Sequence, residues 1–496
     1  MIGGGLAGIS AAIGLADAGL EVALLESRPW LGGATWSFAR RGLTIDNGQH
    51  VFPRCSVAYR DLLARLGVGS SVSIQDALDL TVLCPDGQAR VRRSWLPAPW
   101  HLARSLAGYR LLSRSERVKV AAAALALQFV DVAAGDDRSL GEWLARHGQD
   151  ERARRLFWDQ LSLSALNVDS ERADLYTAAE AICTVLLTRR DSADLGVPSV
   201  PLSQLHGSPA AELLRQLKVM VRLGVRASSL RPDPADGWEI GLAYGGHAAA
   251  PEGSDIRRGG VFEHGPSRIY AAGVVLAVPA WEAAILAPDS LGQDAARWAQ
   301  LDPSPVMSIH VVYGSRVTRL PFAAAADSPV HWVMDKTASA GLHAGQYLAA
   351  SVRAADGYLD TPVAQLRAEF LPAMERLFPA AAEASVEDFF VTRERRATIA
   401  HVPGSLRLRA AGPRLAGFAL AGAWTDTGWP DTMEGAVRSG QAAAQKLIEE
   451  LPARATVPVS TVPVSAVPAS RPADRAGPES SEATPPDITQ HASSPA

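Results

Sequence analysis

Residues 1–26 read MIGGGLAGISAAIGLADAGLEVALLE, and this stretch decides the fold. Gly3, Gly5 and Gly8 have the spacing of a glycine-rich loop that opens a helix, and the apolar strand that follows ends at Glu26. Such a loop brings backbone N–H groups and a helix N-terminus against a pyrophosphate, and an acidic residue about 20 positions later binds a ribose. The stretch predicts a dinucleotide-binding unit of the α/β class.

Only Met1 and Ile2 precede the glycine loop. This unit normally has a first strand of about five residues, buried on both faces of a parallel sheet. The first strand is therefore truncated in this sequence. We expect the true start to lie upstream, with Met1 either an internal residue or a misassigned start codon.

The composition is that of an ordinary folded protein with two or three cores: 496 residues, 47% hydrophobic and 20% charged. A net charge of −4 without blocks of like charge argues against a nucleic-acid partner. Cys55, Cys84 and Cys183 are too widely spaced for a disulfide framework or a zinc site, so we expect no metal and a reducing, cytoplasmic location. Residues 1–25 lack the basic start of a secretory signal.

Two further segments, far apart in the chain, indicate which dinucleotide is bound. SRPWLGGATWSF (27–38) places a Gly-Gly pair just after the strand, and LAGAWTDTGWPDTMEGAVRSGQAAA (420–444) combines a strand ending in glycine, a turn and a final helix. Both resemble the FAD motifs of the amine-oxidase and carotenoid-desaturase superfamily. The resemblance implies FAD as the cofactor and a Rossmann-like FAD-binding domain interleaved with an α+β substrate domain.

In these motifs the Gly-Gly backbone runs along the phosphates of the cofactor. The final helix points its N-terminus at the pyrimidine end of the flavin, where negative charge gathers on reduction. The residues expected to contact FAD are Gly3, Gly5, Leu6, Ala7, Gly8, Glu26, Ser27, Arg28, Gly32, Gly33, Ala34, Gly48, Val225, Gly422, Ala423, Thr432, Met433 and Ala436.

Two positions depart from the superfamily pattern. Ala34 follows the Gly-Gly pair, where the superfamily often has arginine, and Ala423 follows Gly422, where it often has an acid that holds the ribityl chain. Asp426 is either a substitute for that acid or a turn-forming residue. Together with the truncated first strand, Ala423 leaves open a degenerate binding protein that has lost FAD.

The sequence DNGQH, within LTIDNGQHVFPRCSVAYRDLLARLG (43–67), resembles a motif of the hydroxysqualene dehydroxylases of bacterial squalene and hopanoid synthesis. This resemblance implies an oxidoreductase that replaces the hydroxyl of hydroxysqualene by a hydride from reduced flavin, giving squalene, with a C30 isoprenoid as substrate. It extends over residues 96–119, 274–286, 394–404 and 420–444.

This chemistry requires an apolar, dry site with one proton donor, because hydroxide is a poor leaving group. His50 is a candidate donor, since the DNGQH turn should lie near the flavin, but it could equally only order the turn. Asp46 is either a second catalytic residue or a cap. Several aromatic residues are either walls of an isoprenoid tunnel or ordinary core: Trp95, Trp100, Phe129, Trp143, Phe157, Trp158 and Trp332.

Three other interpretations stay open. The chain could be a carotenoid desaturase or amine-oxidase-like dehydrogenase, a non-redox flavin-dependent polyene isomerase, or the degenerate FAD-binding protein. Flavin motifs do not set the direction of electron flow, and the sequence names neither the electron donor nor the oligomeric state.

The most membrane-like stretch, residues 118–135, is shorter and less apolar than a membrane span, and a buried helix is the favoured interpretation over one lying on a membrane surface. Basic residues flank it, and they are either solvated or rest on anionic headgroups at the inner face of the membrane: Arg104, Arg110, Arg114, Arg117 and Lys119.

The domain organisation expected from these patterns is discontinuous. An FAD-binding domain comprises residues 1–90, 205–300 and 400–451, and a substrate domain comprises 91–204 and 301–399. Residues 245–268 form a flexible glycine-rich insertion. The Pro/Ser/Ala-rich tail, 452–496, is expected to be disordered.

Overall fold

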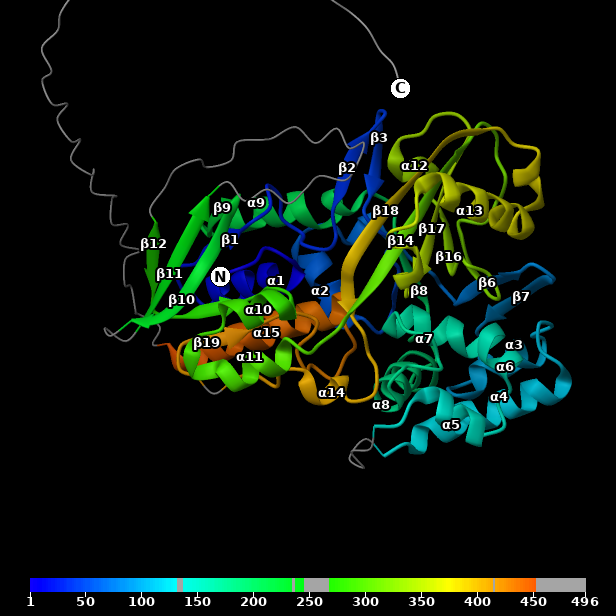
Figure 1. The fold of residues 1–496 in the computed structure, drawn as a ribbon, viewed down its shortest axis with the longest axis horizontal. Coiled ribbons are helices and arrows are strands. Elements are labelled where there is room, and N and C mark those ends of the chain that lie inside the picture. Colours follow the sequence, from blue (N-terminus) through cyan, green and yellow to red (C-terminus); the bar gives the residue numbers. More distant parts are fainter. Residues whose placement is uncertain (132–136, 234–236, 245–266, 414, 452–496) are drawn as a thin grey trace, which may run out of the picture. The chain divides into compact units, whose positions relative to one another are not determined.

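The computed structural model describes residues 1–131, 137–233, 237–244, 267–413 and 415–451 (Figure 1). The glycine-rich insertion, apart from its last two residues, and the tail at 452–496 lie outside the described residues. All of the described residues belong to one unit of the chain, Met1–Val462.

A layer of short parallel strands carries the glycine loop. β1 (Ala23–Glu26) pairs with β9 (Met220–Leu223), and β13 (Val274–Leu276) pairs with β19 (Phe418–Leu420). Ile2 lies between the two pairs and forms parallel bridges to Leu25 and Leu276. Ile2 alone therefore takes the position that a first strand normally has.

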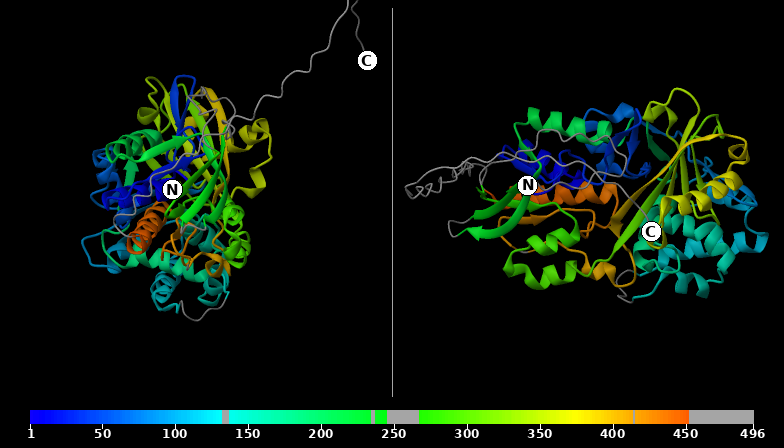
Figure 2. Two further views of the ribbon diagram at one scale, coloured as in Figure 1. Left: turned by 90° about the vertical axis from the view of Figure 1, so that its left-hand side faces the viewer. Right: turned by 45° about the horizontal axis from the view of Figure 1, so that its top comes forward.

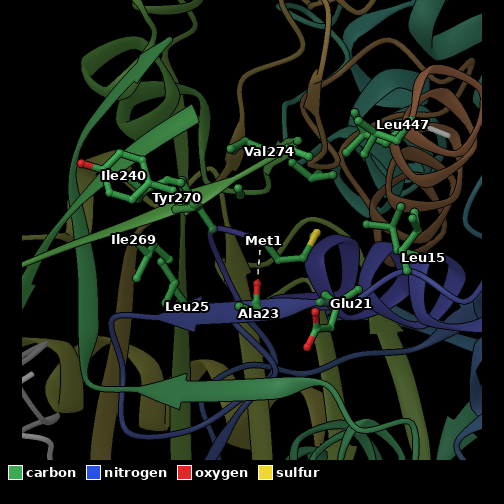
Figure 3. A pocket seen from close by; sticks show the side chains of 18 residues that line it. Met1, Leu15, Glu21, Ala23, Leu25, Ile240, Ile269, Tyr270, Val274 and Leu447 are labelled. Carbon is green, nitrogen blue, oxygen red and sulfur yellow. Dashed lines mark hydrogen bonds between the residues drawn. The ribbon is translucent and has the colours of Figure 1, made fainter. Parts of the chain in front are cut away.

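A small apolar cavity of about 100 Å³ lies beside Ile2 (Figure 3). Its walls include Leu15 and Leu447 on one side and Leu25 and Ile269 on the other. The Met1 amino group donates a hydrogen bond to the Ala23 carbonyl at 2.7 Å. The N-terminus is thereby held inside the strand layer.

Two long helices pack against each other on this layer (Figure 1, Figure 2). α1 (Leu6–Asp17) begins at the glycine loop, and α15 (Met433–Glu450) begins at Thr432, whose side chain accepts a hydrogen bond from the Gly435 N–H. Small residues allow the two helices to lie close together, because a Cβ on Gly440 would lie 2.2 Å from the Ala7 carbonyl oxygen. The contact fixes the two helix N-termini relative to each other.

Smaller elements complete this half of the molecule. They are the hairpin β2 (Ser37–Arg40) and β3 (Leu43–Asp46); α2 (Val57–Arg65); the sheet β4 (Phe52–Pro53), β8 (Leu195–Pro198) and β5 (Val72–Ile74); α9 (Ser208–Gln216); the antiparallel sheet β10 (Val225–Asp233), β11 (Gly237–Tyr244) and β12 (Arg268–Ala271); and α10 (Ala280–Leu286), α11 (Gly292–Trp298) and α14 (Ser405–Leu408).

A seven-stranded sheet forms the other half, in the order β18-β14-β17-β16-β15-β6-β7. Its strands are β6 (Asp79–Cys84), β7 (Gly87–Arg92), β14 (Pro303–Tyr313), β15 (Phe322–Ala325), β16 (Trp332–Asp335), β17 (Gln346–Arg353) and β18 (Val386–Ile399), with α12 (Thr337–Ala340) and α13 (Val363–Leu377) alongside. The domain boundary expected near residue 90 thus falls within β7, which pairs with β6 in this sheet.

The side chains of this sheet alternate between two cores, as strand geometry requires. Phe322 and Trp332 face a helical region, whereas Ala323 and Val333 face α13. The helical region comprises α3 (Ala103–Ala107), α4 (Arg114–Ala126), α5 (Leu140–Arg146), α6 (Glu151–Ala153), α7 (Asp159–Leu166) and α8 (Leu175–Ile182).

Residues 132–135 of the stretch expected to form a buried helix lie outside the described residues, and the helix in its described part is buried on one face only. α4 starts at a capping box between Ser113 and Glu116 and ends at Ala126. Its residues Val120 and Ala123 are buried, whereas Val118 is 70% exposed. No helix among the described residues is long and apolar enough to cross a membrane.

Candidate active site

The glycine loop has the geometry that close backbone approach demands. Gly3 has a φ of +104°, and a Cβ there would lie 2.2 Å from the Ala277 carbonyl oxygen. A Cβ on Gly8 would lie 2.0 Å from the Gly3 carbonyl oxygen. Gly5 ends the loop as the N-cap of α1 without a side-chain cap, and the first turn of α1 holds no acidic side chain. The helix N-terminus is therefore suited to a phosphate group.

The end of β1 is tied directly to this loop. The Glu26 carboxylate, 6% exposed, accepts hydrogen bonds from the Gly4 N–H and the Arg28 N–H, each at 2.7 Å. Ser27 Oγ donates to the same carboxylate at 3.2 Å. The acid expected to bind a ribose therefore lies against the glycine loop.

The Gly-Gly pair packs on the same loop. The Gly32 N–H donates to the Gly4 carbonyl at 2.9 Å, and a Cβ on Gly33 would lie 2.7 Å from the Gly5 Cα. Arg28 donates to the Gly33 carbonyl at 2.9 Å, and the Arg28 carbonyl accepts from Gly224, the neighbour of Val225. The residues expected to contact FAD between positions 3 and 34 thus lie close together, with Val225 nearby. Their contact with FAD stays a prediction.

The C-terminal motif joins this place through α1 and α15. Gly422, at a φ of +148°, donates from its N–H to Ser439 Oγ at 2.8 Å. Thr432, Met433 and Ala436 stand at the start of α15. Asp426 is exposed and accepts from the Gly428 N–H at 3.4 Å, a contact typical of a turn-forming residue.

A residue that the sequence did not single out holds the loop after Gly422. The buried Arg409 guanidinium donates to the carbonyls of Ala423, Thr425 and Trp429 at 3.1, 2.6 and 2.6 Å. An arginine outside any recognised motif gives no signal in a single sequence, so only the fold identifies this role.

The DNGQH turn follows β3 and is strongly anchored. Asp46, 3% exposed, forms an ion pair with Lys336 Nζ at 2.9 Å and accepts from Ser37 Oγ at 2.7 Å and the Leu202 N–H at 2.9 Å. Lys336 comes from a distant segment of the chain, and no motif marks it. These contacts order the turn, and a catalytic role for Asp46 stays a prediction.

His50 is a neutral imidazole at pH 7. Burial lowers the pKa of His50 to about 4, although the nearby Asp46 opposes the shift. Its Nδ1 lies 3.3 Å from the Gly48 carbonyl oxygen. Near neutral pH only one of the two imidazole nitrogens therefore carries a proton, and the role of His50 as proton donor stays a prediction.

Unpaired polar atoms lie in the loops before β2 and after β3. Both amide atoms of Gln49 and the indole Nε1 atoms of Trp30 and Trp36 are buried and have no hydrogen-bond partner within the described part of the chain. The Trp30 and Trp36 rings stack with centroids 4.8 Å apart. Buried polar groups without partners are rare and costly in folded proteins, so these atoms fit a site that a bound polar group completes.

A largely apolar cavity of about 370 Å³ is lined by residues just after the DNGQH motif and by residues of the helical region. Residues that follow the DNGQH motif, Val51 and Phe52, line one end together with Trp429, Thr432 and Met433 of the C-terminal motif. Val51 is on the wall, whereas His50 is not. The remaining walls include Leu80, Leu106, Leu125, Leu161 and Leu186.

The expected wall aromatics divide into three groups. Trp100, Phe157, Trp158 and Trp332 line the cavity. Trp143 belongs to the core of the helical region. Trp95 and Phe129 are 80% and 85% exposed, so they are neither wall nor core.

The comparisons with known proteins agree with this geometry. Residues 6–448 match the model of the family described as flavin containing amine oxidoreductase. The chain is 26% identical to a hydroxysqualene dehydroxylase of Rhodopseudomonas palustris, covering 90% of this chain and 97% of that protein, and 27% identical to one of Sinorhizobium fredii, covering 91% and 98%. A zeta-carotene desaturase of Zea mays is 24% identical, covering 89% and 81%.

Solved structures show the same fold. A cyclohexylamine oxidase of Brevibacterium oxydans superposes with a TM-score of 0.67 at 19% identity, covering 90% of this chain and 98% of that one. A putrescine oxidase variant superposes with a TM-score of 0.67 at 18% identity, with the same coverage.

Proposed function

This chain belongs to the family of flavin-containing amine oxidoreductases, and on that premise we propose that it removes the hydroxyl of hydroxysqualene reductively to give squalene. It is an FAD-dependent oxidoreductase. The observation that carries the proposal is the apolar cavity of about 370 Å³, whose lining includes Trp429, Thr432 and Met433 of the flavin motif. Such a cavity suits a long hydrocarbon substrate rather than a small amine.

The residues of this chain have distinct tasks in that reaction. The glycine loop and the N-terminus of α1 would hold the pyrophosphate, and Glu26 would accept a hydrogen bond from a ribose hydroxyl. The N-terminus of α15 would favour negative charge on the flavin ring. Bound FAD supplies a hydride when it is reduced.

The cavity contributes by excluding water and orienting the isoprenoid. Its walls include Leu106, Leu125 and Leu161, which offer no hydrogen bonds to the substrate. A cationic carbon that forms on hydroxyl departure would therefore be protected from capture by solvent water. The proton that the departing hydroxyl needs must come from a side chain that reaches this cavity.

The direct test is an anaerobic incubation of the holoenzyme, with its FAD reduced by dithionite, and hydroxysqualene. We expect squalene in the extract, identified by mass spectrometry, with oxidation of the flavin in equal amount. A variant that cannot hold FAD is the control. Absence of squalene from a fully reduced holoenzyme would reject this function.

A carotenoid desaturase is the second candidate, because relatives named zeta-carotene desaturase match the chain over a similar length. The same cavity would take a long polyene. Incubation of the oxidised holoenzyme with phytoene or zeta-carotene and a quinone acceptor separates the two, since a desaturase would reduce its flavin and add a double bond. Unchanged bond number with a shifted absorption spectrum would instead favour a polyene isomerase.

We also propose that the protein meets its substrate at an anionic membrane surface on the cytoplasmic side. Trp100 lines the cavity and is 56% exposed, so the cavity opens beside it. The side chain of Phe129 is exposed one turn beyond the wall residue Leu125. Among the described residues, no carboxylate pairs with the exposed Arg104 or with Arg110. Such a rim, apolar with unpaired basic residues, suits the interface of an anionic bilayer.

A further inference from the structure

Three ionisable side chains line the apolar cavity within the described part of the chain: Tyr109, Glu180 and Glu434. Tyr109 donates its hydroxyl to the Leu156 carbonyl at 2.8 Å. Glu434, 1% exposed, accepts from the Ala58 and Tyr59 N–H groups at 3.2 and 2.8 Å and pairs with Arg438. Both groups are therefore occupied by structural contacts.

Glu180 differs from the other two. Glu180 lines the cavity and is an exposed residue, and among the described residues its carboxylate has no hydrogen-bond or ion-pair partner. A carboxyl group in an apolar cavity without a partner has no evident structural task. Carboxyl groups beside apolar walls are common proton donors, because even partial desolvation favours the protonated form.

The local structure places Glu180 beside the C-terminal flavin motif. It lies on α8, which is capped by Asp174 and runs into a π-helical turn, Cys183–Leu187, whose residues also line the cavity. Turns of this kind often occur at functional sites. A Cβ placed on Gly428 would lie 3.6 Å from Glu180 Oε1, so the carboxylate faces the flavin motif.

The surroundings of Glu180 favour its protonated form. Partial desolvation by the surrounding residues raises the pKa of Glu180 above its ordinary value, Asp426 adds to the rise, and Arg409 opposes it. Arg409 directs its guanidinium to the carbonyls of the loop 423–429. Its contacts therefore hold the loop that contains Gly428, and among the described residues it forms no ion pair with Glu180.

We propose that Glu180 is the proton donor to the departing hydroxyl, an inference that rests on the proposed function. Glu180 gives its proton to the substrate oxygen, the C–O bond breaks, and water leaves. The carbon becomes an allylic cation facing the Glu180 carboxylate, and it gains a hydride, with both electrons, from the reduced flavin, which is oxidised. The sum is one alcohol, one proton and one hydride giving one hydrocarbon and one water.

Two probes test Glu180 without turnover. The oxidised holoenzyme is titrated with N,N-dimethyldodecylamine, which carries a cation on an apolar chain, and with 1-dodecanol, which is neutral. Binding is followed by the flavin absorbance. We expect Glu180→Gln to weaken amine binding about tenfold and leave dodecanol binding unchanged. Equal amine affinity in both proteins would overturn the proposal.

Single-turnover kinetics test the proton transfer itself. The anaerobic, reduced Glu180→Gln holoenzyme should form squalene at least a hundredfold more slowly than the wild type, and Glu180→Asp should recover part of the rate. Glu142→Gln, on the exposed face of α5, is the matched control and should keep the wild-type rate. Wild-type rates in Glu180→Gln would overturn the proposal.

The two failures are distinguishable. If the wild type forms squalene and Glu180→Gln forms it equally fast, only the role of Glu180 fails. If the wild type forms no squalene, the proposed function fails and the donor role fails with it, whereas the amine titration then shows whether the carboxylate serves another substrate in the same cavity.

Discussion

Alanine substitutions at Gly33 and Gly42 test whether the glycine loop needs close backbone packing to bind FAD. Both have a positive φ, +58° and +79°, so alanine strains the backbone at either position. Only at Gly33 would the new Cβ meet backbone, at 2.7 Å from the Gly5 Cα, whereas at Gly42 it would meet nothing within 4 Å. The two substitutions therefore separate backbone strain from loop packing.

We expect Gly33→Ala to push the Gly-Gly segment off the glycine loop and to lower FAD affinity at least tenfold. Gly42→Ala should cost about 1 kcal/mol of stability and leave FAD affinity unchanged. Flavin titration of the apoprotein measures the first quantity and thermal unfolding the second. Equal FAD affinity in both variants would show that the loop tolerates the displacement.

At the scale of elements, the contact of α1 with α15 couples the two ends of the chain. The Ser10 hydroxyl donates to the Val437 carbonyl at 3.2 Å, one turn from the contact between Gly440 and Ala7. Ala7 belongs to the first turn of α1, which is expected to face the pyrophosphate. Spreading the helices should therefore disturb the cofactor site as well as the core.

Gly440→Val should destabilise the protein by about 1–3 kcal/mol, because its Cβ would lie against backbone that must shift. FAD affinity should fall with it. Ala442→Val, on the exposed side of the same helix, should cost less than about 1 kcal/mol and spare FAD binding. Denaturant unfolding and flavin titration measure both effects, and a similar loss in both variants would contradict the packing argument.

At the scale of the whole molecule, buried histidines govern the response to acid. Burial lowers the pKa of His50 and His331 to about 4, and that of His206, His310 and His401 to about 3. Unfolded histidine titrates near 6.5, so the unfolded state binds more protons below that pH. Stability that is fully present above pH 6.5 is therefore lost as the pH falls toward 3–4.

We expect the melting temperature to fall steadily from pH 7 to pH 5. Each buried histidine should lower the free energy of unfolding by about 2 kcal/mol at pH 5. Asp431, whose pKa is raised to about 6 by burial, opposes the loss only in part. His206→Gln should flatten the pH dependence, whereas His343→Gln, at an exposed position, should leave it unchanged. A melting temperature that is constant over this range would contradict the prediction.

The proposed membrane contact is also a property of the whole surface. Flotation with vesicles of phosphatidylglycerol and phosphatidylcholine should retain the protein, and the pair Trp95→Ser and Phe129→Ser should reduce retention severalfold. Ile285→Ser removes an exposed apolar side chain from α10, which contributes no residue to the cavity lining, and should not change vesicle retention. Absence of retention on anionic vesicles would reject the membrane contact.

The sequence by itself determined the cofactor half of this protein. The glycine loop, Glu26 and the Gly-Gly pair lie within residues 3–33, and their task depends on backbone conformation that glycine spacing encodes locally. The tertiary structure decided what surrounds the reacting atoms. The pairing of Lys336 with Asp46, the loop held by Arg409 and the position of Glu180 opposite Gly428 join residues from separate segments of the chain. Such contacts depend on how sheet and helices pack, and no local pattern marks their members.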